Sequence, residues 1–162
     1  MDEYRQSNRK MWDELAQINA RSQFYNLAGF KAGEKILHPL ELAELGPFVA
    51  GQRLLHLQCH FGMDTLSWAR LGAQVTGVDF SPKAIEMAQN LAAELNIPAR
   101  FLCSDIYDLP AILDETFDIV FTSYGVLTWL SDLGGWAWLV AGYLRPGGRF
   151  YMAEFHPTGM ML

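Results

Sequence analysis

Short apolar runs alternate with longer stretches in which apolar residues recur every three or four positions, from about residue 53 onward. The longer stretches have the spacing of amphipathic helices, and the short runs have the length and composition of buried strands. The predicted strands are 53–58, 73–79, 99–104, 117–124 and 149–155. This alternation predicts an α/β fold with a doubly wound, mostly parallel sheet, covered by helices on both faces and built with right-handed crossovers.

Capping residues mark the predicted helix ends. Ser81 followed by Pro82 has the composition of an N-cap and a first helical residue. Gly72 is expected to close the helix that begins near Met63, and Asp132 to cap the helix before the fifth strand. The turn "RPGG" then leads into that strand.

The N-terminal part of the chain has a different pattern. Apolar residues at helical spacing predict an amphipathic helix over 3–19, and "LELAELGPF" predicts a second, short helix. The glycine-containing connection between them carries aromatic residues, which is typical of a movable cover over a ligand, although an ordinary packing segment would have the same pattern. We expect residues 1–46 to form a helical cap and residues 47–162 to form the ligand-binding core.

Composition narrows the class of protein. The chain has 162 residues, of which 51% are hydrophobic and 19% charged, as expected for a single globular domain. The net charge of -6 argues against a nucleic-acid partner, because phosphates require a basic face. A polar N-terminus and the lack of a long apolar run argue against a membrane partner. With two cysteines, Cys59 and Cys103, both expected to be buried thiols, the sequence predicts a cytoplasmic protein.

Polar residues gather at the predicted carboxyl ends of the strands, where parallel sheets bind ligands. Asp79 lies about twenty residues beyond the first strand's turn, the spacing that places a carboxylate beside a ribose. Asp79 could instead cap the next helix, but Ser81 is better placed for that role. The polar residues at these ends are Gln58, Asp79, Ser104, Asp105, Ser123 and Tyr124.

Four ordered segments resemble the class I S-adenosylmethionine-dependent methyltransferases. These are "VTGVDFSPKAIEMAQ", "FLCSDIYDLP", "FDIVFTSYGVLTWL" and "YLRPGGRFYMAEF", and the resemblance covers about residues 48–156. It implies a Rossmann-like fold, S-adenosylmethionine as cofactor and methyl transfer to a small-molecule substrate. Asp105 would then accept from the adenine amino group beside the backbone N–H of Ile106, while Phe80 and Met63 would offer the adenine an apolar surface.

The first motif departs from the family pattern, which reads acidic-x-Gly-x-Gly-x-Gly. Those four positions are His56, Gln58, His60 and Gly62 in "HLQCHFG". His56 supplies no negative charge, and Gln58 and His60 must either adopt positive φ angles or reshape the turn. The predicted cofactor-binding residues are His56, Gln58, His60, Gly62, Met63, Asp79, Phe80, Asp105, Ile106 and Ser123.

Methyl transfer needs positioning and exclusion of water more than a strong catalytic signature. Where the acceptor must lose a proton, Tyr124 and His156 are the candidate bases, and His60 could also face the methyl group. Each candidate also has a purely structural explanation, since Tyr124 could close the pocket and His156 could end a strand.

Three other interpretations of "HLQCHFG" remain open. A metal site at His56, Cys59 and His60 would lack a second set of ligands, so no metal is predicted. An NAD-dependent oxidoreductase would need G-x-G-x-x-G, of which only Gly62 is present. A non-catalytic binding or assembly module would keep the fold without the cofactor.

The family fold normally continues beyond the fifth strand with a helix and two further strands, whereas this sequence stops at "HPTGMML". We therefore expect a C-terminally truncated core in which the edge of strand 149–155 lacks a neighbour. Either the chain is part of a longer enzyme or a second copy covers the edge. The latter predicts a homo-oligomer formed through this strand.

Overall fold

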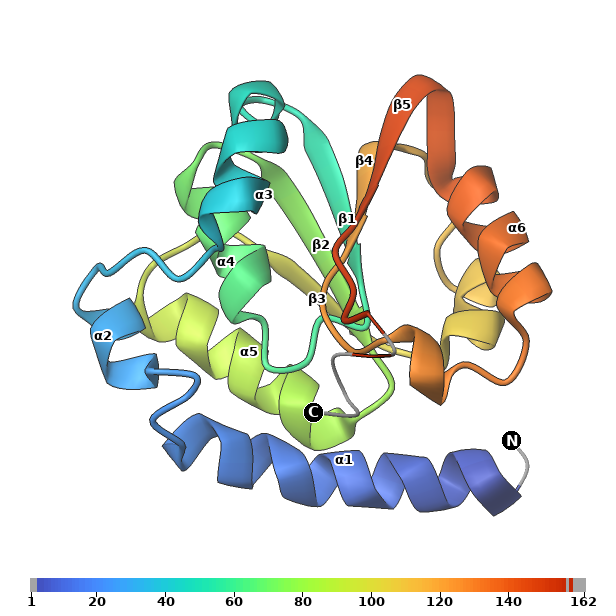
Figure 1. Ribbon diagram of the computed structural model, residues 1–162, viewed down its shortest axis with the longest axis horizontal. Coiled ribbons are helices and arrows are strands. Elements are labelled where there is room, and N and C mark those ends of the chain that lie inside the picture. The colour runs from blue at the N-terminus through green and yellow to red at the C-terminus, as the bar shows by residue number, and fades with distance from the viewer. Residues whose placement is uncertain (1–2, 157, 159–162) are drawn as a thin grey trace.

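The computed structural model describes residues 3–156 and 158, which form a five-stranded parallel sheet between two layers of helices (Figure 1). The sheet order is β3-β2-β1-β4-β5, and every neighbouring pair is parallel. The strands are β1 (Arg53–Leu57), β2 (Gln74–Asp79), β3 (Arg100–Cys103), β4 (Phe117–Thr122) and β5 (Leu144–Met152). The predicted α/β fold class is therefore confirmed.

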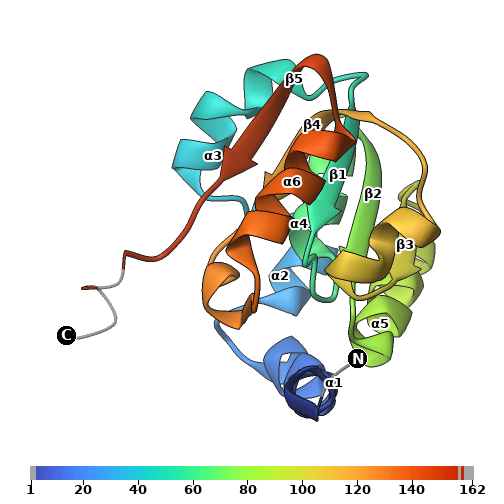
Figure 2. The ribbon, with the colours of Figure 1, turned by 90° about the vertical axis from the view of Figure 1, so that its right-hand side faces the viewer.

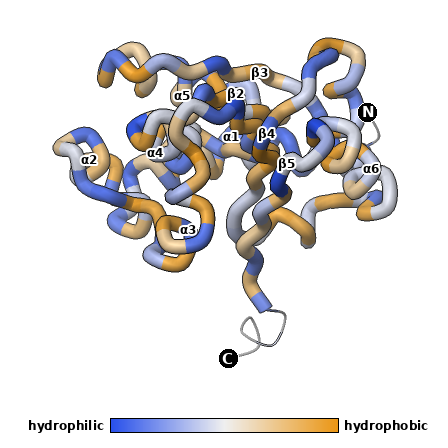
Figure 3. Tube along the Cα trace, turned by 90° about the horizontal axis from the view of Figure 1, so that it is seen from above, coloured by the Kyte–Doolittle hydropathy of each residue, from blue (hydrophilic) through white to orange (hydrophobic). Residues whose placement is uncertain are grey.

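Helices cover both faces of the sheet (Figures 1 and 2). Viewed from above, α6 lies on one side of β4 and β5, and α2, α3 and α4 lie on the other (Figure 3). The 3-10 helices η1 (Gly46–Phe48), η2 (Ile106–Ala111) and η3 (Leu127–Trp129) lie in the connections. The α-helices are α1 (Glu3–Arg21), α2 (Leu27–Lys31), α3 (Pro39–Glu44), α4 (Met63–Arg70), α5 (Pro82–Glu94) and α6 (Leu133–Tyr143).

Alternation along β1 divides the core between the two faces. Leu55 and Leu57 pack in the cluster that α6 and η2 cover, whereas Leu54 packs with Trp68 of α4 on the opposite face. All three leucines are fully buried. Because successive strand side chains point to opposite faces, His56 shares the face of Leu54 and not that of its neighbours.

The strand order places a binding position at the carboxyl end of β1. The chain proceeds outward from β1 to β2 and β3, then returns to the other side of β1 for β4. At such a reversal the two flanking crossovers leave in opposite directions and open a crevice above the strand ends. The residues that follow β1, β2 and β4 therefore face one another.

Several local features differ from the sequence prediction. Helix α2 forms where a connection was expected, because Asn26 adopts a left-handed conformation (φ 46°) and accepts from the Gly29 N–H. Strand β5 begins at Leu144, so "RPGG" lies inside it as an irregularity in the pairing with β4. Cys103 is exposed, not buried, because β3 is an edge strand.

Among the described residues, no helix is both long and apolar enough to cross a membrane.

Candidate functional site

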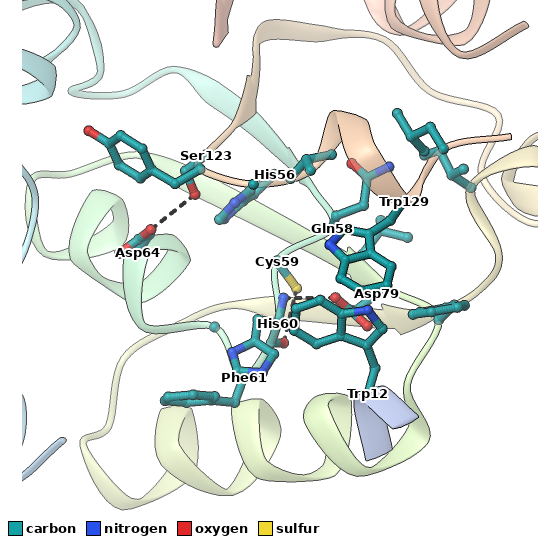
Figure 4. Close-up of a pocket in the computed structure, with 18 of the residues that line it drawn as sticks. Trp12, His56, Gln58, Cys59, His60, Phe61, Asp64, Asp79, Ser123 and Trp129 are labelled. Carbon is teal, nitrogen blue, oxygen red and sulfur yellow. Dashed lines mark hydrogen bonds between the residues drawn. The ribbon is translucent and has the colours of Figure 1, made fainter. Parts of the chain in front are cut away.

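A cavity of about 450 Å³ lies at the carboxyl ends of β1, β2 and β4. Helix α1 contributes Trp12 to its wall, and the turn after β1 contributes Gln58 and His60 (Figure 4). Cavities of this size accommodate a cofactor-sized ligand. All the predicted cofactor-binding residues line the cavity.

The turn after β1 keeps the backbone of a glycine-rich turn without most of the glycines. Gln58, His60 and Gly62 have φ angles of 53°, 52° and 81°. Left-handed backbone costs a residue with a Cβ about 1–2 kcal/mol, so Gln58 and His60 carry strain that glycines would avoid. Hydrogen bonds hold the turn: the Cys59 N–H donates to Val78 O at 2.9 Å and the Gly62 N–H to Cys59 O at 3.0 Å.

Asp79 joins this turn to the end of β2. Its Oδ2 accepts from the His60 N–H at 2.8 Å and its Oδ1 from the Ser81 N–H at 2.9 Å. Ser81 is the N-cap of α5, since its Oγ accepts from the Ala84 N–H at 3.0 Å. Asp79 is therefore not the helix cap, and each carboxylate oxygen retains the capacity to accept a further hydrogen bond.

Five buried side-chain atoms that belong to cavity-lining residues have no hydrogen-bond partner among the described residues: Glu41 Oε1, His56 Nε2, Gln58 Oε1, Gln58 Nε2 and His60 Nε2. Burial lowers the pKa of His56 to about 3 and that of His60 to about 4, so both imidazoles are neutral at pH 7. A buried polar atom without a partner costs about 1–3 kcal/mol. A polar ligand in the cavity would recover this free energy.

The opposite wall contains Asp105, which has more partners than the sequence indicated. It caps η2 by accepting from the Tyr107 N–H at 3.0 Å, and its Oδ2 lies 3.7 Å from Arg5 of α1. Ile106 is buried next to it, and Phe80 also lines the cavity. Any ligand amino group that binds Asp105 must share this carboxylate with Arg5 of α1.

Helix α1 lies over the cavity and belongs to the segment 1–46 for which the sequence predicts a helical cap. Trp12 packs edge-to-face on His60 and Trp129, at centroid distances of 5.5 and 5.4 Å. Asp13 accepts from the Ser81 hydroxyl at 2.6 Å. Trp12 belongs to the apolar stripe of α1, which by itself predicts only packing against a core.

The two predicted bases are not equivalent in position. Tyr124 lines the cavity, is 38% exposed and packs against Phe155 at a centroid distance of 5.4 Å. His156 is exposed, contacts Thr158 through Nδ1 at 2.7 Å and is not among the residues that line the cavity. The chain leaves the sheet after Met152, so His156 is carried away from the strand ends.

The cluster "HLQCH" does not assemble in space. His56 Nδ1 lies 2.8 Å from Thr65 Oγ1, whereas the His60 ring packs among Trp12, Tyr25 and Phe61. Over residues 3–156 and 158, no group of three or more His, Cys, Asp or Glu side chains is arranged to hold a metal ion.

Glu154 organises the loop that follows β4, although nothing in its local sequence indicated this. Its carboxylate accepts from the backbone N–H groups of Gly125, Val126 (2.8 Å), Leu127 (3.0 Å) and Phe155 (2.8 Å). Burial opposes its ionisation, but these donors together hold the pKa of Glu154 below its usual value. Because residues of this loop line the cavity, Glu154 fixes one of its walls.

Glu154→Gln is expected to lower the free energy of unfolding at pH 7 by about 1–3 kcal/mol, because an amide has one acceptor oxygen and no charge. A depressed carboxyl pKa stabilises the fold above the unfolded-state pKa and ceases to do so as the pH falls through the folded-state pKa. The variant should therefore also lose stability less steeply below pH 5 in urea titrations. Glu86→Gln, which removes only a surface ion pair with Lys83, is the control. Equal stability of the two variants would contradict this role.

The buried acids give the ligand-free protein a second pH dependence. Burial raises the pKa of Asp79 to about 6 and that of Glu41 to about 7. The folded protein thus retains protons on these two acids that the unfolded chain releases, so their contribution to the free energy of unfolding decreases as the pH rises from about 4 to 7. Each group contributes on the order of 1–3 kcal/mol. In wild type the lowered pKa values of His56 and His60 act in the opposite direction, so the test compares wild type with Glu41→Gln. The difference in urea midpoint, wild type minus variant, should fall between pH 5 and 8, and a constant difference would contradict the raised pKa of Glu41.

Comparison with known proteins adds independent information. A family described as "Methyltransferase domain" matches residues 55–152. The ubiquinone biosynthesis O-methyltransferase of Xanthomonas axonopodis pv. citri is 32% identical over 126 residues, which cover 75% of this chain and 52% of that protein. The chain spans about half the length of the curated relatives that it matches.

Solved structures show the same likeness. A SAM-dependent methyltransferase from Thiobacillus denitrificans, in complex with S-adenosyl-L-homocysteine, is 27% identical with a TM-score of 0.58, covering 78% of this chain and 54% of that one. The cyclase SpnF is 29% identical with a TM-score of 0.61, covering 68% of this chain and 41% of its own.

Proposed function

We propose that this chain, which belongs to the class I S-adenosylmethionine-dependent methyltransferases, binds S-adenosylmethionine and transfers the methyl group to a small-molecule acceptor. The observation that carries this proposal is the set of buried, unpartnered atoms of His56, Gln58 and His60 beside Asp79. These donors and acceptors belong to residues that line a cavity of cofactor size, and a nucleoside-containing ligand would satisfy them.

In this assignment the ribose hydroxyls donate to Asp79, whose two oxygens still have room to accept. The adenine lies against Phe80 and Met63, with its amino group toward Asp105 and its ring toward the Ile106 N–H. His56, Gln58 and Ser123 border the remainder of the cofactor, and the backbone of Gly62 approaches it closely. When bound, the cofactor supplies a methyl group that is already activated by its sulfonium.

The chain's own residues then orient the acceptor and exclude water. We assign the covering role to the N-terminal cap, residues 1–46, because Trp12 and Tyr25 both pack on His60. His60 is the better candidate base, since its imidazole is neutral and its Nε2 is unpartnered. Burial and the nearby Glu41 and Asp64 raise the pKa of Tyr124, so its hydroxyl stays protonated and positions the acceptor.

A small acceptor fits this arrangement better than a macromolecule. The cavity is walled by α1, and the net charge of -6 disfavours nucleic acid. The relatives named for ubiquinone biosynthesis O-methylation also support a small molecule. We place the protein in the cytoplasm, where its two free cysteines would remain reduced.

A second candidate is a related protein that binds the cofactor without methyl transfer. It is favoured by one comparison, since the similar protein SpnF, with 29% identity, is a [4+2]-cyclase. Formation of S-adenosyl-L-homocysteine in the presence of an acceptor separates the two functions.

The test of the proposed function is calorimetric titration with S-adenosyl-L-homocysteine, with NAD as a parallel ligand. Saturable binding of the former alone is expected. Preferential binding of NAD would support the oxidoreductase interpretation. If the folded protein bound neither ligand, the result would contradict the proposal.

We also propose that the edge of β5 pairs with a second copy of the chain. Among the described strands β5 lies at one end of the sheet, and its Phe150 and Met152 are 40% and 41% exposed. A paired edge would satisfy its backbone groups. Light scattering that gives a monomer mass at micromolar concentration would contradict this assembly.

A further inference from the structure

We propose that Glu41 and Asp64 form a cation-binding end of the cavity, which receives an ammonium group. This inference rests on the proposed function and extends it to a second pair of acids that the sequence prediction did not include. Glu41 is the third residue of α3, and Asp64 lies in the first turn of α4. Both line the cavity.

Glu41 has an unusual environment for a carboxylate. Its Oε2 accepts from the His38 N–H at 2.7 Å in a capping box at the start of α3. Its Oε1 is buried without a hydrogen-bond partner among the described residues, and the whole residue is only 1% exposed. A capping box needs one carboxylate oxygen, so helix capping does not explain the burial of the other.

Asp64 lies close enough to Glu41 for its charge to raise the pKa of Glu41, after the larger effect of burial. Its Oδ2 accepts from the Ser123 hydroxyl at 3.1 Å. Figure 4 shows Asp64, Ser123 and His56 at one end of the cavity, away from Asp79 and His60. Two acids that face the same space repel each other unless one is protonated or a cation lies between them.

The rest of the cavity supplies no competing cation at this end. Arg5 is the one lysine or arginine among the described residues that line the cavity, and it lies beside Asp105. His56 is neutral because burial lowers its pKa. In the tautomer whose Nδ1 donates to Thr65, its unpartnered Nε2 is an acceptor. An ammonium has three donors, and Glu41, Asp64 and His56 offer it three acceptors.

The two acids also compensate for the charge that the first motif lacks. The position that is acidic in the family pattern is occupied here by His56, which contributes no negative charge. The two acids come instead from α3 and α4 and line the same cavity. The ammonium has two possible sources: the amino-acid part of the cofactor or an amine on the acceptor. The same chemistry recognises both, and ligands with and without each group distinguish them.

The experiment compares wild type, Glu41→Gln and the control Glu44→Gln by titration calorimetry at pH 7.5. Glu44 lies on the same helix but bonds Tyr151 at 3.0 Å and does not line the cavity. Three probes are used: S-adenosyl-L-homocysteine, 5′-methylthioadenosine, which has no ammonium, and propylamine added to the S-adenosyl-L-homocysteine complex. Glu41→Gln should weaken one ammonium probe about 10-fold or more. Binding of 5′-methylthioadenosine should not change, and Glu44→Gln should resemble wild type.

The affected probe identifies the source. A loss for S-adenosyl-L-homocysteine assigns the site to the cofactor, and a loss for propylamine alone assigns it to the acceptor. Unchanged binding of both ammonium probes in Glu41→Gln would overturn the inference while 5′-methylthioadenosine still supports the proposed function. If no nucleoside binds wild type, the proposed function fails and this inference fails with it.

Two readouts separate binding from folding. Glu41→Gln should melt no lower than wild type at pH 8, because the variant removes a buried carboxyl whose ionisation is unfavourable. Ammonium binding should also release up to about one proton per site near pH 7 in wild type and none in Glu41→Gln. The titratable groups that act with Glu41 are Asp64 on α4, Tyr124 after β4 and Tyr151 on β5. A lower melting temperature together with unchanged proton release would assign Glu41 a structural role only.

Discussion

Asp79→Ala is expected to weaken the binding of S-adenosyl-L-homocysteine by about 100-fold or more. Hydrogen bonds to a charged group contribute about 1.5–3 kcal/mol each, and the two ribose hydroxyls would both donate to this carboxylate. Loss of both corresponds to at least about 3 kcal/mol, or more than 100-fold in affinity. The same substitution also frees the His60 and Ser81 N–H groups, which loosens the turn that borders the cofactor.

The matched control is Asp13→Ala. Asp13 bonds Ser81 from α1 at 2.6 Å but does not line the cavity, so its removal tests the helix contact alone. Titration calorimetry of both variants should show a large loss for Asp79→Ala and a small one for Asp13→Ala. Binding by Asp79→Ala within a factor of three of wild type would contradict the ribose assignment.

Gly62→Ala is expected to lower the free energy of unfolding by about 2–5 kcal/mol. Gly62 has a φ of +81°, and an added Cβ would lie 2.8 Å from the Phe101 ring and 2.9 Å from the Ala88 Cβ. The backbone strain costs about 1–2 kcal/mol and the overpacking about 1–3 kcal/mol. Urea unfolding followed by tryptophan fluorescence measures the change.

Two further glycines separate these contributions. Gly147→Ala imposes only backbone strain, because φ is +78° and nothing lies within 4 Å of the new Cβ. Gly77→Ala imposes only overpacking, with the Phe101 ring at 2.7 Å and Cys59 Sγ at 2.9 Å. Gly62→Ala should exceed Gly147→Ala by the packing cost. Equal losses would mean that the turn moves away from Phe101 without penalty.

Features that depend on neighbouring residues were predictable from the sequence. Ser81 with Pro82 marked the start of α5, and Asp132 marked that of α6. The sequence left two possibilities for Gln58 and His60, positive φ angles or a reshaped turn. The structure shows positive φ angles, so the turn keeps the backbone conformation of a glycine-rich turn. Local chemistry of this kind is present in the sequence before the chain folds.

Features that depend on distant segments were not predictable. Glu154 and the loop after β4 are nearly thirty residues apart, and only the finished sheet brings them together. In the sequence Glu41 is only an acid in a short predicted helix, and its closeness to Asp64 becomes visible only in the folded chain. The predicted fifth strand ended at residue 155, directly before His156, but β5 starts earlier and ends at Met152. Such contacts depend on how the strands and helices are arranged in space. A single sequence indicates this arrangement only through the order of its predicted elements.

The proposed function depends most directly on the glycine-poor turn, which must still form a nucleotide site with Asp79. The measurement that tests it is a crystal structure of the chain with S-adenosyl-L-homocysteine. We expect both ribose hydroxyls within hydrogen-bonding distance of the Asp79 carboxylate, with Gln58 and His60 still at positive φ. A ribose bound elsewhere in the cavity, or a turn that must refold to admit the nucleoside, would contradict it.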